Sequence, residues 1–220
     1  MNKTPLSTLA ALATLSLFAA SSAFASTNLV TNGSFEDLSG SLNHGTWGEF
    51  STLSGWTIAS ASKTNVFEIQ QASEYSHVSG FNTHYDGTYY LELNSNNLGA
   101  ITQTLSTTAG QTYTLSFGYA DRSGSKNASS MDIYWNGTQL KPINTGDTNW
   151  KTYSYTVAAT GASTALTFVS TGPVKDVTMG SYLDGVSVTA VPEPESYAML
   201  LAGLGVMATI ARRRSKATQA

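Results

Sequence analysis

The feature of this sequence that most restricts its fold is an alternation of apolar and polar residues with a period of two. Tyr113, Leu115, Phe117 and Tyr119 alternate with Thr, Ser and Gly. Successive side chains of a β-strand point to opposite faces of the sheet, so this alternation predicts a strand with one buried face. The same pattern recurs at residues 56–58, 89–93, 101–105, 131–135, 153–157, 166–168 and 186–188.

Turn-forming residue pairs separate these predicted strands. The pairs are Asn32-Gly33, Asp86-Gly87, Ala109-Gly110, Asn136-Gly137 and Asp184-Gly185. Such pairs tolerate the backbone angles that tight β-turns require. No helical periodicity is visible between the two ends of the chain. Strands at intervals of about ten residues across 26–190 predict an all-β fold, most simply a single jelly-roll sandwich of two sheets.

Residues 1–25 have the pattern of a secretory signal peptide with a helical apolar part. Lys3 precedes an apolar run at 6–20, and Ala23 and Ala25 are small residues at the expected cleavage site. Signal peptidase recognises this arrangement, so we expect cleavage after residue 25 and export of the rest of the chain. The alternative is a transmembrane helix, for which the apolar run is short against a hydrocarbon layer of ~30 Å.

The C-terminal residues 191–220 contain three different segments in a fixed order. These are Pro192, Glu193 and Pro194, then the apolar stretch 197–211, then the basic residues Arg212, Arg213 and Arg214. The apolar stretch predicts a short transmembrane helix, about 22 Å long at 1.5 Å per residue. The arginines would then remain in the cytoplasm and the body of the protein would lie outside.

This order of segments resembles the PEP-CTERM sorting tail. The resemblance implies that an exosortase recognises the tail in the inner membrane of a Gram-negative bacterium. The protein would be an inner-membrane-anchored precursor that is passed to the cell surface or the extracellular matrix. Bacteria with such tails generally make exopolysaccharide. The alternative is an ordinary C-terminal anchor, which needs no Pro-Glu-Pro sequence and usually has ~20 apolar residues.

The composition excludes several classes of partner and chemistry. The chain has no cysteine, which rules out disulfides, thiol nucleophiles and cysteine-based metal sites. Residues 26–191 contain six basic and twelve acidic residues, a net charge of −6. This acidic surface argues against binding of nucleic acid or anionic lipid, and it suits a neutral partner such as a polysaccharide.

Several short motifs of the central region occur in a fixed order, at residues 28–36, 55–56, 86–93, 101–105, 110–117 and 182–188. In this order they resemble the motifs of galactose-binding-like jelly rolls, which include carbohydrate-binding module families. They are also similar to those of an extracellular family of unknown function first noted in plant cell-wall proteins. The resemblance covers nearly all of 28–190 and implies one domain with the jelly-roll fold.

The same resemblance implies a structural calcium ion between the first and last strands. Glu36 and Asp184 occupy the positions whose carboxylates bind calcium in those families, and Asp86 lies in a turn that could add oxygen ligands. Calcium takes about six to eight oxygen ligands, mostly from carboxylates and backbone carbonyls. The alternative is that Glu36 and Asp184 are ordinary polar residues at strand ends.

The sequence contains no motif of an enzymatic reaction, and we expect no catalysis. The Gly-x-Ser-x-Gly nucleophile elbow and the glycine-rich nucleotide-binding loops are absent. His77 and His84 have no third nearby ligand for a transition metal. A glycoside hydrolase needs only two carboxylates. Candidates by residue type are Glu49, Glu68, Glu74, Glu92 and Asp132, and nothing in the sequence marks a pair among them.

Sugar rings stack on aromatic side chains, while amides and carboxylates take the hydroxyl groups. Most aromatic residues here share a strand face with Leu, Ile or Phe, which predicts that they lie in the core. Tyr90 and Tyr134 lie on the other faces of their strands, and together with Glu92 they predict a groove on an outer sheet face. A loop site at Trp47 and Tyr75 is the alternative.

Together these observations predict an exported, exosortase-sorted protein that binds polysaccharide, or packs among it, without catalysis. Two other functions remain open. The low charge and the edge strands of a sandwich would suit a self-associating structural protein of a biofilm or matrix. The second alternative is a small glycoside hydrolase or lyase.

Overall fold

The strands form where the alternating pattern predicts them. The computed structural model describes residues 27–59, 66–72, 85–122, 129–144, 146–172, 178, 180–192 and 194–217. The elements of this described part are β1 (Trp47–Phe50), β2 (Thr57–Ile58), β3 (Phe67–Gln71), β4 (Tyr89–Glu92), β5 (Ala100–Ser106), β6 (Thr112–Asp121), β7 (Ser130–Trp135), β8 (Thr138–Gln139), β9 (Ile143–Asn144), β10 (Lys151–Ala158), β11 (Ser163–Gly172), β12 (Ser181–Ala190) and α1 (Pro194–Ala217).

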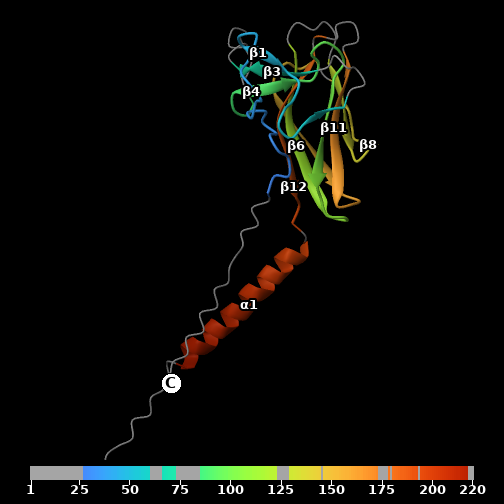
Figure 1. The fold of residues 1–220 in the computed structure, drawn as a ribbon. Coiled ribbons are helices and arrows are strands. Elements are labelled where there is room, and N and C mark those ends of the chain that lie inside the picture. The colour runs from blue at the N-terminus through green and yellow to red at the C-terminus, as the bar shows by residue number, and fades with distance from the viewer. Residues whose placement is uncertain are drawn as a thin grey trace, which may run out of the picture.

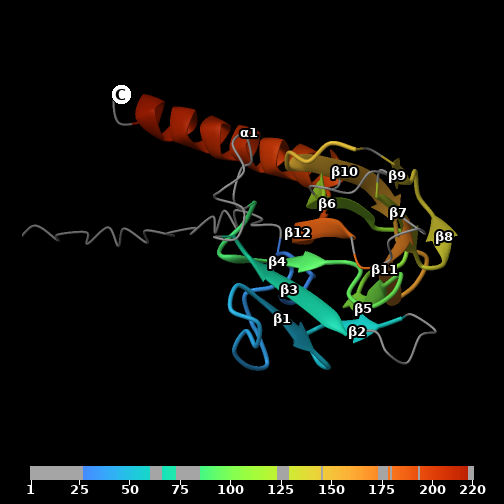
Figure 2. The same cartoon turned by 90° about the horizontal axis from the view of Figure 1, so that it is seen from above.

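The strands pair into two antiparallel sheets that face each other (Figures 1 and 2). The first sheet has the order β1-β3-β4-β12-β6-β10, and the second has the order β2-β5-β11-β7-β8, with β9 also paired to β7. The start of the domain is joined to its last strand, because the Leu29 amide donates to the Val188 carbonyl (2.9 Å) and the Val188 amide donates to Asn28 Oδ1 (2.9 Å). The predicted two-sheet jelly-roll sandwich is therefore confirmed.

The hydrophobic core fills the space between the two sheets. Tyr113, Leu115, Phe117 and Tyr119, on β6, are each no more than 4% exposed. Phe117 meets Phe168, on β11 of the second sheet, edge to face, with 5.1 Å between the ring centroids. Such aromatic pairs add to the free energy gained by burying the rings themselves. The period-two alternation thus identified the inward faces correctly.

A second, smaller apolar cluster covers part of the outer face of the first sheet. It consists of the buried residues Ala72, Tyr90, Ala120 and Tyr182, with the half-buried Trp150 against them. Beside it the ring of Tyr85 lies over Gly118 of β6, where an added Cβ atom would come within 2.5 Å of the Tyr85 ring. Gly118 therefore permits Tyr85 to pack directly on the strand backbone. These side chains cover the strand backbone at this part of the outer face.

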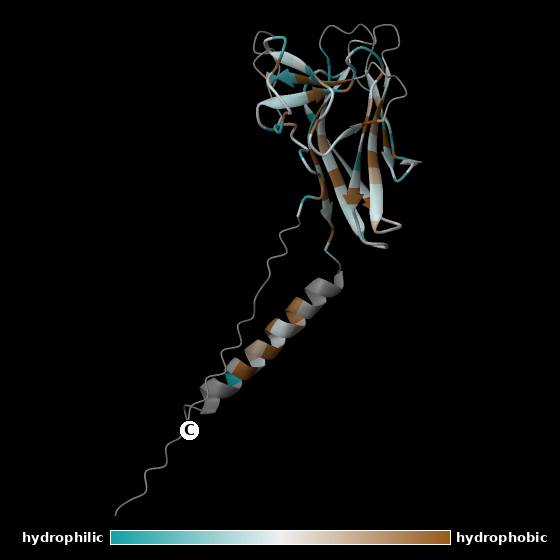
Figure 3. Cartoon of the chain, viewed as in Figure 1, coloured by the Kyte–Doolittle hydropathy of each residue, from teal (hydrophilic) through white to brown (hydrophobic). Residues whose placement is uncertain are grey.

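The C-terminal helix α1 (Pro194–Ala217) includes the predicted helical stretch 197–211 and extends beyond it on both sides. Its apolar side chains between residues 200 and 210 are exposed, among them Leu201 at 68% and Leu204 at 59%, and they colour the middle of the helix as hydrophobic in Figure 3. Within the described residues, we find no helix that combines the length and the apolar character needed to cross a membrane.

Several expectations fall on residues that lie outside the described ranges. The signal peptide with its cleavage residues Ala23 and Ala25 is one of them, and Glu193 of the Pro-Glu-Pro sequence is another. The candidate ligand residue Tyr75 and both histidines of the 73–84 segment also lie outside the described residues.

Candidate functional site

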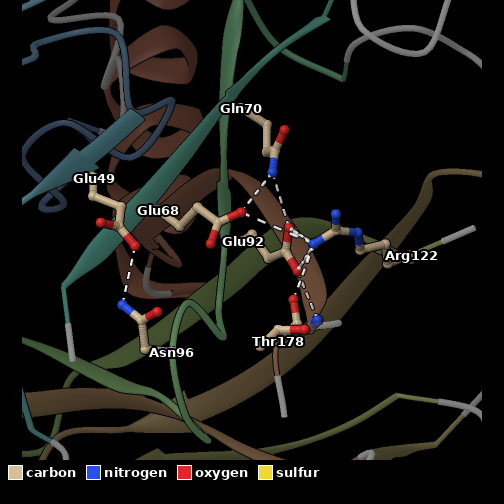
Figure 4. A network of polar contacts seen from close by, with 8 residues as sticks. Glu49, Glu68, Gln70, Glu92, Asn96, Arg122 and Thr178 are labelled. Atoms are coloured by element: carbon tan, nitrogen blue, oxygen red, sulfur yellow. Dashed lines mark hydrogen bonds and ion pairs between the residues drawn. The ribbon is translucent and has the colours of Figure 1, made fainter. Parts of the chain in front are cut away.

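A pocket of about 330 Å³ lies on the outer face of the first sheet. Polar side chains and one tryptophan surround it, several of which are drawn in Figure 4. The lining residues are Trp47, Glu49, Glu68, Gln70, Ser95, Asn96, Arg122 and Thr178.

The register of three neighbouring strands creates the acidic character of this pocket. Glu49 of β1 is paired with Glu68 of β3, and Glu68 is paired with Glu92 of β4. Directly paired residues of antiparallel strands place their side chains on the same face, so three carboxyl groups form one row across the sheet. Like charges in this arrangement repel each other and require compensation.

Arg122, which follows β6, supplies that compensation at the inner end of the row. Its Nη1 atom lies 2.6 Å from Glu92 Oε1 and 2.8 Å from Glu92 Oε2, and 3.9 Å from Glu68 Oε1. The same nitrogen donates to the Thr178 carbonyl at 3.0 Å. The Gly180 amide donates to Glu92 Oε1 at 2.7 Å. Glu92 is 1% exposed, so it forms a buried ion pair with additional hydrogen bonds, and its partner Arg122 lines the pocket.

Gln70 links the two inner carboxyl groups. Its Nε2 atom donates to Glu68 Oε1 at 2.7 Å and to Glu92 Oε2 at 3.0 Å. Burial, together with the neighbouring charge of Glu92, raises the pKa of Glu68 to about 8. Burial also raises the pKa of Glu92, against the opposing effect of Arg122. The two carboxyl groups therefore hold a proton at neutral pH, and the group of Glu68, Glu92 and Arg122 is close to neutral.

Glu49 lies at the outer end of the row and is partly exposed. Asn96 donates from Nδ2 to Glu49 Oε1 at 3.0 Å, which holds this carboxylate against the pocket wall (Figure 4). Trp47, two residues earlier on β1, is also partly exposed and stacks on His44 with 4.1 Å between the ring centroids. The pocket thus has an aromatic side chain, a carboxylate and the Asn96 amide at its mouth.

The predicted sheet-face groove of Tyr90, Glu92 and Tyr134 is wrong. Tyr90 and Glu92 belong to β4 of the first sheet, whereas Tyr134 belongs to β7 of the second sheet. Tyr90 is 1% exposed, because Tyr182 and Trp150 pack edge-on against it at centroid distances of 4.9 and 5.5 Å. It therefore offers no open face to a sugar ring. The alternation placed Tyr90 and Tyr134 on the correct faces of their strands. It did not show that the two strands belong to different sheets, or that other side chains cover Tyr90.

The alternative prediction was a loop site at Trp47 and Tyr75. Trp47 does line the pocket, but it is the first residue of strand β1 and does not lie in a loop. Three of the five candidate carboxylates, Glu49, Glu68 and Glu92, come together in one row. Asp132 lies on β7 of the second sheet, and Glu74 lies outside the described residues. No local pattern of the sequence marks the polar partners of this row, so they were not predicted. These partners are Gln70, Asn96, Arg122 and Thr178.

The candidate calcium residues lie elsewhere, near the point where the opening turn, the turn before β4 and the last strand meet. Glu36 Oε1 accepts hydrogen bonds from the amides of Thr88 (2.6 Å) and Tyr89 (2.7 Å). Asp184 is completely buried and accepts from the amides of Asp86 (2.8 Å) and Gly185 (2.7 Å). Glu36 therefore fixes the turn before β4, and Asp184 joins that turn to β12.

The electrostatic environment of Asp184 is unfavourable for a bare carboxylate. Burial, together with the smaller effects of the Asp86 and Glu36 charges, raises its pKa to about 8. A cation at this point would relieve both effects, so the donor chemistry fits a hard metal ion. In the described part of the chain, no three acidic or histidine side chains alone are grouped closely enough to hold a metal. Backbone carbonyls would have to complete the coordination.

Solved carbohydrate-binding modules are similar to this chain at low identity. A family 61 module in complex with β-1,4-galactotriose is 14% identical, covers 76% of this chain and 100% of its own, and has a TM-score of 0.48. A family 35 module from Paenibacillus barcinonensis is 26% identical, with coverages of 67% and 100% and a TM-score of 0.40. A family 16 module is 14% identical, with coverages of 74% and 99% and a TM-score of 0.48. No curated protein matches the chain.

Sequence families give a firmer assignment. Residues 190–215 match the PEP-CTERM protein-sorting motif, which confirms the resemblance of the tail. Residues 28–189 match the family described as protein of unknown function DUF642. This second match spans the whole sandwich and well over half of the sequence, and the protein therefore belongs to the DUF642 family.

Proposed function

We propose that this protein is exported, recognised by an exosortase through its PEP-CTERM tail, and binds carbohydrate at the pocket around Trp47 and Glu49 without catalysis. The observation that carries the binding site is the pocket itself. An aromatic side chain, two amides and a row of carboxyl groups surround a space of about 330 Å³ on a rigid sheet. Aromatic faces and polar groups in this combination suit a sugar ring with its hydroxyl groups.

Rigid positioning supports a binding role. Glu49 and Trp47 are on β1, and β1 is held to β3 by a regular four-residue register. The inner carboxyl groups are fixed by Gln70 and Arg122. A preorganised site of this kind loses little conformational entropy when a ligand binds.

Replacing Trp47 should remove most of the carbohydrate binding. In the Trp47→Ala variant we expect the affinity for a bound oligosaccharide to fall at least about tenfold, because ring stacking is lost. The measurement is a glycan array followed by isothermal titration calorimetry of the best ligand with the purified full chain. Tyr134→Ala, on the second sheet, is the matched control and should bind as the wild type does. Equal binding by the Trp47 and Tyr134 variants would contradict this site.

Hydrolysis of a glycoside is a second candidate function, and one observation favours it. Glu68 holds a proton at neutral pH and is paired across the strands with Glu49, as a general acid and its partner carboxylate would be. The test is release of reducing ends from a polysaccharide that the protein binds. Release that is abolished in both Glu68→Gln and Glu49→Gln would establish a hydrolase in place of binding alone.

We also propose that calcium binds between Glu36 and Asp184, as the resemblance to the jelly-roll families implies. The buried, fully desolvated Asp184 and the converging charges of Glu36 and Asp86 support this assignment. Calcium would supply structural stabilisation there, by joining the opening turn to the last strand.

A further inference from the structure

We propose that the pocket around Trp47 and Glu49 selects the free ammonium group of an amino sugar, that is, a hexosamine unit without its N-acetyl group. This inference rests on the proposed carbohydrate binding and names the class of sugar. The charges that support it are those of the described lining residues and of Glu92, which the lining residue Arg122 binds.

The pocket lining, together with the buried Glu92 that Arg122 binds, contains more acidic groups than basic ones. Glu49, Glu68 and Glu92 stand in one row, and Arg122 is the only cation among the described lining residues. The Arg122 guanidinium is already engaged, since its Nη1 atom contacts both oxygens of Glu92 and the Thr178 carbonyl. The surplus negative charge therefore lies toward Glu49, at the mouth of the pocket. A cationic ligand complements this charge, whereas a uronic acid would add a further carboxylate to it.

The groups at the mouth also match the shape and hydrogen bonding of an ammonium ion. An ammonium group has three donors and no acceptor, so it requires acceptors around it. Glu49 provides a carboxylate whose position Asn96 fixes, and Trp47 provides an aromatic face within the same wall. A cation near the face of a tryptophan ring gains further electrostatic attraction. An N-acetyl group would replace the donors with a neutral, bulkier amide.

Glu68 gives the proposal a second, independent signature. Its carboxyl group is protonated at neutral pH because it is buried beside Glu92. A cation entering the pocket would favour the ionised form, so Glu68 should release a proton when the amino sugar binds. A neutral sugar would leave the proton in place.

The experiment compares three tetrasaccharides by titration calorimetry on the purified full chain at pH 7. They are a fully deacetylated glucosamine oligomer, its N-acetylated form and an oligogalacturonate. We expect the deacetylated oligomer to bind at least about tenfold more tightly than the acetylated one, and the oligogalacturonate to bind most weakly. Glu49→Gln should remove this preference. Asp132→Asn removes the same charge from the outer face of the second sheet and should keep it.

A second measurement follows proton exchange. The amines of the deacetylated oligomer are partly neutral at pH 7 and take up protons when they bind as ammonium groups, so the wild type is compared with Glu68→Gln in two buffers with different ionisation enthalpies. With the deacetylated oligomer the wild type should release more protons than Glu68→Gln, and with the acetylated oligomer the two should not differ. Equal affinity for the acetylated and deacetylated oligomers would overturn the ammonium proposal and leave carbohydrate binding intact. Equal loss of preference in Asp132→Asn would overturn it too, because general charge would then explain the effect. If no oligosaccharide of any kind binds, both the proposed function and this inference fail.

Discussion

The free energy of unfolding should fall by several kcal/mol as the pH rises from about 5 to 8, which is the reverse of ordinary acid denaturation. Two buried acids cause this. The pKa of Glu68 is raised from 4.5 to about 8, and that of Asp184 from 3.8 to about 8, in both cases mainly by burial. Between these values the folded protein holds protons that the unfolded chain has lost. The stabilisation is therefore complete below the unfolded pKa values and is lost as the pH rises through the folded ones.

The measurement is urea denaturation at pH 5, 6, 7 and 8 in the presence of a chelator. Glu68→Gln and Asp184→Asn should each flatten part of the slope of stability against pH, because each removes one of the two titrating groups. The slope is the readout, so a general loss of stability in either variant does not obscure it. Asp132→Asn, whose side chain is partly exposed on β7, should leave the slope unchanged. Stability that stays constant or rises from pH 5 to 8 in the wild type would show that these carboxyl groups are ionised in the folded state.

The sandwich was predictable because the pattern that specifies each strand lies within a short stretch of sequence. Residues such as Leu115 and Phe117 alternate with small polar residues within a single strand, and burial of that one face is what the two-sheet core requires. The misassignment of Tyr90 has the opposite cause, namely contacts with residues far away in the sequence. Tyr90 lies on the outward face, as the alternation indicates, but Trp150 and Tyr182 form a second apolar layer on that face. Contacts between residues about 60 and 90 positions apart leave no trace in a local pattern.

The pocket was not predictable for a related reason. Its acidic row depends on the register that pairs Glu49 with Glu68 and Glu68 with Glu92. Shifting one strand by a single residue would turn its carboxyl group to the opposite face. The compensating Arg122 is 30 residues from Glu92 and follows a strand that is not its neighbour in the sheet. The sequence contains the residue types of the proposed sugar site, and the strand pairing determines which of them lie together.

Removal of calcium should lower the melting temperature of the purified protein by about 10 °C. A ligand present at roughly a thousand times its Kd stabilises the folded state by ~4 kcal/mol, which in a domain of this size corresponds to a shift of this order. The shift should depend on pH in the direction opposite to that of the apoprotein. Asp184 must be ionised to bind the cation, so the stabilisation by calcium should grow as the pH rises toward 8.

Variants at the two ends of the proposed site separate calcium binding from a general effect of the chelator. Glu36→Gln keeps an oxygen that can accept from the Thr88 and Tyr89 amides, so it should fold and yet lose most of the calcium-dependent shift. Glu68→Gln, in the pocket around Trp47 and Glu49, should retain the full shift, because Glu68 belongs to the row of Glu49 and Glu92 and not to the Asp184 cluster. The decisive condition is pH 8, where Asp184 is most ionised. If chelation leaves the melting temperature of the wild type unchanged there, calcium does not bind at this site. Asp184 would then be a neutral hydrogen-bonding acid that joins the last strand to the turn before β4.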